Sequence, residues 1–145
     1  MDIKEKNIKL IDEVKNFFED NNFYVSYFHF EHIIPDKEFR DNIIKNYQKS
    51  IIAQILLFSP ELFIMGKKEK ANCIFFAICI YDIRDLDDKR IKILKNYYPP
   101  EQIVIFFRDK SIENNKNLFV ISLGELEHID SKRMTINEFI NYIVG

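Results

Sequence analysis

The sequence contains no tryptophan and little glycine, proline or cysteine: 3 Gly, 4 Pro and 2 Cys in 145 residues. Such scarce glycine leaves no glycine-rich loop, which argues against dinucleotide-binding and P-loop phosphate sites. The chain also lacks internal repeats, low-complexity tracts and a linker rich in proline or glycine. We therefore expect one α/β domain over residues 1–145, a length that is sufficient for a self-contained core.

Long hydrophobic runs are missing as well. The most apolar stretches, residues 51–58 and 73–81, are much shorter than the ~20 residues that a membrane-spanning helix requires. The first residues alternate charges with Ile and Leu, which is not typical of a signal peptide. We expect a cytoplasmic protein without membrane association.

The two cysteines lie close together in the sequence. Cys73 and Cys79 are six residues apart in one expected strand, where a disulfide between them is geometrically excluded. They are interpreted as small buried hydrophobic residues in a reducing compartment. An apolar strand disfavours a thiolate, so neither is a good candidate nucleophile.

An excess of positive charge is also absent. The 21 basic and 23 acidic residues give a formal net charge of −2, so the chain has no overall cationic field for binding nucleic acid. Any such binding requires a local patch, and Lys67, Lys68 and Lys70 in a predicted turn are the candidate. The alternative interpretation of these lysines is a solvated turn.

What the sequence does contain is apolar and patterned. Hydrophobic residues make up 47% of the chain, with 14 Phe and 7 Tyr to fill a core. Residues 73–81 are apolar on both alternating faces, which is typical of a central strand covered on each side. The elements predict a mixed central sheet of about five strands flanked by helices. Expected helices cover residues 2–19, 36–58, 86–98 and 135–143, and expected strands cover 23–30, 62–65, 73–81, 103–107 and 118–121.

The stretch from Ser59 to Phe107, SPELFIMGKKEKANCIFFAICIYDIRDLDDKRIKILKNYYPPEQIVIFF, resembles the core of the PD-(D/E)XK nuclease superfamily. In that family a Pro and an acid open a strand, a turn follows, and the next strand carries an acid-x-Lys motif before a helix and a further strand. The resemblance covers about a third of the chain. It implies a restriction-endonuclease-like fold.

Residue by residue, Pro60 and Glu61 match the position of the family's Pro and first metal-binding acid, with Glu in place of the usual Asp. The following strand supplies no acid-x-Lys in any register. The resemblance implies that an active member of this kind would use Glu61 and Asp82 as catalytic and metal-binding acids for Mg²⁺ or Mn²⁺. A lysine displaced onto the next helix, Lys89 or Lys92, would replace the missing one.

The same acids have a structural interpretation. Glu61 would flank the start of a strand, and Asp82 would belong to a solvated helix entry, because acids favour helix N-termini. His29, Glu31, His32 and His128 are residue types that bind zinc. If residues 23–30 form a strand, however, His29 and His32 face opposite ways, so surface histidines are the preferred interpretation.

Three functions follow. The first is a nuclease-like domain that has lost catalysis, needs no cofactor and binds nucleic acid or a protein partner. The second is a divergent metal-dependent nuclease. The third is a small interaction module that forms a homodimer and buries the apolar end of the second helix against another chain. We favour the first, because the Ser59 to Phe107 stretch has the family's order of elements without its chemistry.

Overall fold

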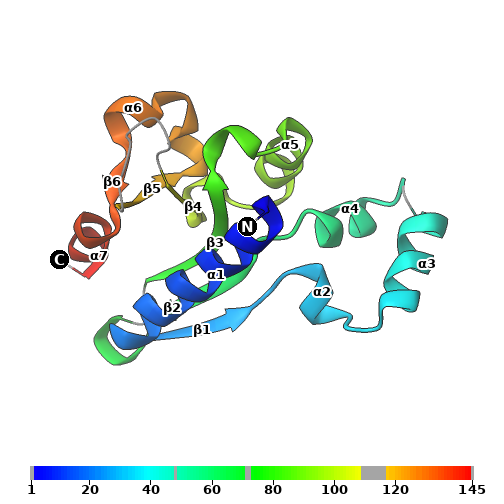
Figure 1. The fold of residues 1–145 in the computed structure, drawn as a ribbon, viewed down its shortest axis with the longest axis horizontal. Coiled ribbons are helices and arrows are strands. Elements are labelled where there is room, and N and C mark those ends of the chain that lie inside the picture. The colour runs from blue at the N-terminus through cyan, green and yellow to red at the C-terminus, as the bar shows by residue number, and fades with distance from the viewer. Residues whose placement is uncertain (1, 48, 71–72, 109–116, 145) are drawn as a thin grey trace.

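The computed structural model describes residues 2–47, 49–70, 73–108 and 117–144. Its elements fold into a sheet with helices on both faces and an arm of short helices at one side (Figure 1). The α-helices are α1 (Ile3–Asp20), α2 (Phe30–Ile33), α3 (Lys37–Tyr47), α4 (Ile51–Leu57), α5 (Asp88–Tyr97), α6 (Ile129–Lys132) and α7 (Ile136–Val144). The 3-10 helices are η1 (Lys68–Lys70), η2 (Ile83–Asp85), η3 (Pro100–Gln102) and η4 (Leu123–His128). The strands are β1 (Phe23–Tyr27), β2 (Leu62–Gly66), β3 (Ile74–Asp82), β4 (Ile103–Arg108), β5 (Leu118–Ser122) and β6 (Met134–Thr135).

The sheet is mixed, and the six strands among the described residues lie in the order β1-β2-β3-β4-β5-β6. Strands β3 and β4 are parallel and are joined by a crossover that contains α5, whereas the other described neighbours pair antiparallel. The α/β class and the mixed sheet flanked by helices are confirmed. The expected number of about five strands was wrong, because the two-residue β6 is too short to show the alternation that identifies a strand.

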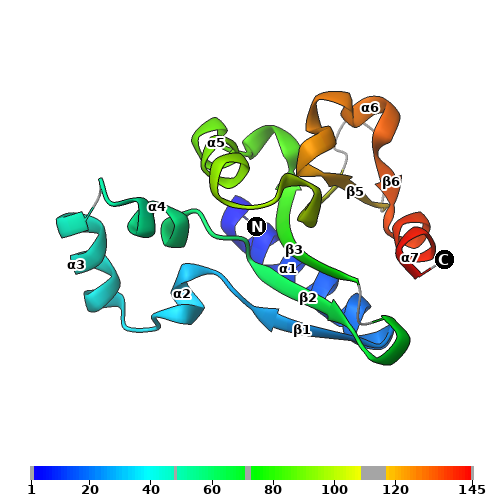
Figure 2. The same ribbon diagram turned by 180° about the vertical axis from the view of Figure 1, so that it is seen from behind.

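Helices cover both faces of the sheet, as the apolar residues on both faces of the central strand predicted. Helices α1 and α7 pack on one face, where Phe18 and Phe106 are completely buried. On the opposite face, seen from behind in Figure 2, α5 and η4 cover Ile78 and Ile105. The successive residues Ile78 and Cys79 therefore enter different cores, which is why the whole strand is apolar.

The expected long second helix is broken. It divides into α3 and α4, and Ser50 at the start of α4 has extended backbone angles of φ −70° and ψ 134° that a helix does not accept. The prediction of one helix was wrong. Helices α3 and α4 contact each other, so both carry apolar residues at helical spacing, and this spacing gives no sign of the break between them. Together with α2 they form the arm, residues 30–47 and 49–57, which extends away from the sheet (Figure 1).

The first strand is also shorter than expected. It ends at Tyr27, and His29 precedes the first turn of α2 instead of extending the strand. At the other end of the chain, a capping box formed by Thr135 and Glu138 begins α7. The Thr135 amide donates to the Glu138 carboxylate over 3.1 Å, and the Glu138 amide donates to the Thr135 hydroxyl over 3.2 Å.

The cysteines are free, and Cys79 is fully buried. Burial raises the pKa of the Cys79 thiol well above its ordinary value, in line with the expected inert core cysteine. Within the described residues, no helix combines the length and the hydrophobicity that crossing a membrane requires.

Candidate functional site

A pocket of about 510 Å³ lies among the described residues where β1 ends and β2 begins. Its volume is within the ~300–1,000 Å³ typical of ligand sites. Four segments that are distant in the sequence meet there: α1, the β1–α2 connection, the start of β2 and α5. We call it the Glu61 pocket. It is lined by Ile8, Ile11, Asp12, Tyr27, His29, Glu31, His32, Glu61 and Arg90.

The backbone holds Glu61 in place at this end of the sheet. Its amide donates to the Ala77 carbonyl over 3.0 Å, and its carbonyl accepts the Phe28 amide over 2.9 Å. Glu61 therefore continues the β2 pairing by one residue on both sides, although it precedes the strand itself. This pairing explains why its side chain is held against β3 instead of extending into solvent.

The carboxylate of Glu61 forms a buried ion pair with Arg90. The guanidinium contacts both carboxylate oxygens, and the Cys79 amide donates to Oε1 over 3.1 Å. The side chains of Arg90 and Glu61 are only 17% and 11% exposed. Three donors thus satisfy a carboxylate that would otherwise be costly to bury.

Arg90 also connects α5 to the chain that enters β2. Its Nη2 donates to the Ser59 carbonyl over 2.7 Å and its Nε to the Phe58 carbonyl over 3.3 Å. The Ser59 hydroxyl in turn donates to the Leu56 carbonyl and accepts the Phe30 amide. The Arg90 guanidinium therefore links α5 to the residues that follow the arm and to Glu61 in the pocket.

The outer part of the pocket is aromatic and acidic. The Tyr27 hydroxyl donates to the Asp12 carboxylate over 3.0 Å, and the Tyr27 ring stacks on His32 with centroids 4.6 Å apart. Burial lowers the pKa of His29, which keeps its imidazole neutral near pH 7, while the Glu61 carboxylate opposes this shift. With Arg90 committed to Glu61, the pocket carries little positive charge to attract a phosphate.

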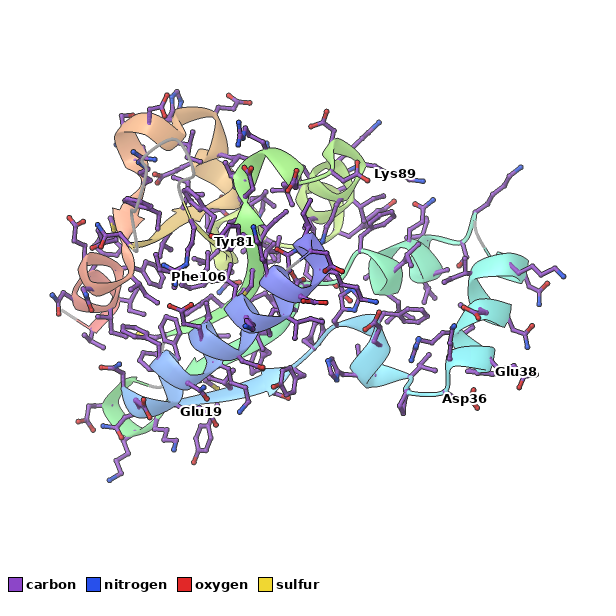
Figure 3. The ribbon with its side chains drawn as sticks, viewed as in Figure 1. Glu19, Asp36, Glu38, Tyr81, Lys89 and Phe106 are labelled. Atoms are coloured by element: carbon purple, nitrogen blue, oxygen red, sulfur yellow. The ribbon has the colours of Figure 1, made fainter. Side chains whose placement is uncertain are left out.

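The predicted catalytic residues lie at different places. Asp82 ends β3, where its carboxylate accepts the Arg84 amide and pairs with the Arg84 guanidinium over 2.8 Å. Asp82 does not line the Glu61 pocket. Lys89 lies on the outer side of α5, with its ammonium 5.6 Å from the centre of the Phe58 ring (Figure 3).

The predicted nucleic-acid-binding lysines lie at the opposite end of β2 from Glu61. Lys67 follows the last residue of the strand and covers the Tyr24 ring at 4.6 Å, and Lys68 is exposed next to it. The side chain of Lys70 is outside the described residues. The structure therefore does not bring these lysines together with Glu61.

A metal centre has little support from the geometry. Among the residues that the structure describes, no three His, Cys, Asp or Glu side chains are arranged to hold an ion. His29, Glu31, His32 and Glu61 line one pocket all the same, which the sequence did not indicate. The short β1 and the turn at His29 bring them there, whereas a longer strand would have separated the two histidines.

Arg90, which pairs with Glu61, is a residue of the site that the sequence did not indicate. It directly follows Lys89, which was considered as the displaced cation. The available signal was helical spacing, because Arg90 precedes Ile93 and Leu94 by three and four residues and both are buried. A charged residue on the buried face of an amphipathic helix is expected to have a partner.

No protein-family model matches the chain, and neither the curated proteins nor the solved structures gave a significant match.

Proposed function

We propose that this protein is a nuclease-like domain that does not cleave its ligand and acts by binding nucleic acid. The order strand, turn, strand, helix, strand that the PD-(D/E)XK resemblance implies corresponds to β2, η1, β3, α5 and β4. The parallel pairing of β3 and β4 around α5 supports the same assignment. These features support the nuclease-like fold. The loss of catalysis is a separate inference, drawn from the chemistry at Glu61.

The observation that carries the proposal is the ion pair between Glu61 and Arg90. Metal-assisted phosphodiester hydrolysis needs carboxylates that converge on a hard cation. The Glu61 carboxylate is committed to a guanidinium and a backbone amide. A cation would have to displace Arg90 and leave it buried without its partner, which is costly.

The strand beside Glu61 supplies no substitute for the missing acid-x-Lys motif. The residues of β3 beside Glu61, from Ala77 to Cys79, are apolar and carry neither an acid nor a lysine. Asp82 is paired with Arg84, and Lys89 lies against Phe58. A binding role is therefore a better fit to this site than hydrolysis.

The test is an assay of cleavage and binding with labelled single-stranded, duplex and branched DNA and RNA, with Mg²⁺ or Mn²⁺. We expect mobility shifts without cleavage, both in the wild type and in Glu61→Gln, which keeps an acceptor for the Cys79 amide. Metal-dependent cleavage that disappears in Glu61→Gln would establish the divergent nuclease instead. The Glu101→Gln variant, an exposed position in η3 outside the Glu61 pocket, makes the same charge change and is the control for a general effect of altered charge.

One observation favours a second candidate, the small assembly module. Three large apolar side chains on the arm, Phe39, Ile51 and Ile52, are 55%, 55% and 71% exposed, and a partner chain would cover them. If this function is correct, the protein self-associates and Ile52→Lys makes it monomeric. Light scattering after size-exclusion chromatography measures both, and a monomeric wild type at high concentration would eliminate this candidate.

A further inference from the structure

A second concave site lies at the carboxyl ends of the parallel strands β3 and β4. It has a volume of about 320 Å³, and α1 lies between it and the Glu61 pocket. Ligands of open α/β sheets commonly bind beyond the carboxyl ends of strands, where helices and strand ends leave a crevice. We call it the Lys9 pocket. It is lined by Lys6, Lys9, Leu10, Glu13, Tyr81 and Arg108.

The Lys9 pocket and the Glu61 pocket lie on different sides of α1. Lys6, Lys9 and Glu13 are spaced by three and four residues, which places them on one side of the helix. Asp12 faces the Glu61 pocket on the other side. The Lys9 pocket thus has three cationic side chains against one carboxylate, on a chain whose overall charge is −2.

Structured contacts position the cations of this pocket. Arg108, at the end of β4, donates to both Glu13 carboxylate oxygens over 2.5 and 2.6 Å. The ammonium of Lys6 lies 4.9 Å from the centre of the Tyr81 ring, and the Tyr81 amide donates to the Asn7 side chain over 2.8 Å. Figure 3 shows Tyr81 beside the N-terminal half of α1. The Glu13 carboxylate offsets part of the Arg108 charge, and the two lysines supply the excess.

We infer that the Lys9 pocket binds a phosphate group of single-stranded nucleic acid; this inference rests on the proposed function and specifies where the ligand lies. Lysine and arginine side chains are the usual partners of phosphate oxygens. An aromatic ring beside such cations is typical of single-strand sites, where bases stack on it. The Lys9 pocket provides both within one hollow.

This site is a better phosphate site than the turn at Lys67 and Lys68. The lysines of that turn come from one short segment of the chain, in which Glu69 directly follows Lys68. The turn also lies next to the C-terminal end of α1, which ends with Glu19 and Asp20, because the Lys67 amide donates to the Asn22 carbonyl over 3.1 Å. The lining of the Lys9 pocket, by contrast, comes from three elements, α1, β3 and β4.

The test is fluorescence anisotropy with a labelled single-stranded oligonucleotide at several salt concentrations, for wild type, Lys6→Gln and Lys9→Gln. One phosphate contact on a single strand contributes about 0.7 to the slope of log affinity against log salt, and this corresponds to roughly a fivefold effect near 0.1 M salt. We expect each substitution to lower the affinity about fivefold and to reduce the slope by about 0.7. Two variants with the same charge change, Lys4→Gln on α1 and Lys68→Gln in the turn, should bind like the wild type.

The outcomes separate this inference from the proposed function. Oligonucleotide binding that weakens in Lys68→Gln, or equally in Lys4→Gln, would overturn the Lys9 pocket as the site and leave the proposed function standing. In parallel, inorganic phosphate is titrated while the amide NMR signals of Lys9 and Tyr81 are followed. Phosphate-dependent shifts that Lys9→Gln abolishes, without oligonucleotide binding, would support the phosphate site and overturn the proposed function. Neither response in the wild type would overturn both.

Discussion

Substitution of Arg90 by methionine tests the central contact of the Glu61 pocket. The variant keeps an apolar side chain of similar length but leaves the Glu61 carboxylate buried without its cation. Removing one partner of a buried ion pair typically costs ~3–5 kcal/mol. We expect a cost of this size because both side chains are largely buried, with Arg90 17% and Glu61 11% exposed. Arg90 also donates to the Ser59 carbonyl, and the substitution removes this hydrogen bond too.

Urea denaturation measures this cost. With the ~1–3 kcal/mol per molar dependence typical of small proteins, the loss lowers the unfolding midpoint by roughly 1.5–2.5 M at an intermediate slope. Combining Arg90→Met with Glu61→Gln removes both charges, so the double variant should be more stable than the sum of the single effects predicts, by at least about 1 kcal/mol.

The pair between Asp82 and Arg84 provides the matched control. Arg84 is 75% exposed, and Asp82 also accepts the Arg84 backbone amide, so Arg84→Met should cost less than about 1 kcal/mol. If Arg90→Met and Arg84→Met cost the same, or if the double variant shows no coupling, Glu61 is not held by Arg90 as argued. The Glu61 carboxylate would then be available to a cation, and the inferred loss of catalysis would be wrong.

Three further predictions concern the core and the titrating groups. Phe18→Ala should destabilise the fold by ~3–5 kcal/mol because Phe18 is fully buried and its ring packs edge-on against several others. Phe39→Ala is the exposed comparison, and an equal loss in urea denaturation would contradict the assigned core. In an NMR pH titration, His29 should titrate below the ordinary histidine pKa of about 6.5, because burial lowers its pKa. Its neutral form stabilises the fold above that ordinary value, and this contribution is lost as the pH falls through the lowered pKa; a raised pKa would refute the burial argument. Cys79 should react with a thiol reagent only after unfolding, since burial raises its pKa, so rapid labelling of a Cys73→Ser variant in the native state would contradict this placement.

Local pattern in the sequence predicted most of the elements. Helix α1, the apolar β3 and the capping box of Thr135 and Glu138 each follow from residues that are neighbours in the chain. The break between α3 and α4 did not follow, because the apolar spacing of two contacting helices continues through Ser50. The two-residue β6 is visible only through its pairing with β5.

In the two candidate sites as well, the sequence determined some features and the tertiary structure determined the others. The sequence by itself determined the α/β class, the free cysteines and the position of Glu61 at the entrance to a strand, because these depend on composition and short-range periodicity. The tertiary structure alone decided that Arg90, and not Lys89, reaches Glu61, and that Lys6, Lys9 and Arg108 surround one hollow. Such contacts join residues separated by tens of positions, and a single sequence carries no signal of which distant side chains meet when strands pair and helices pack.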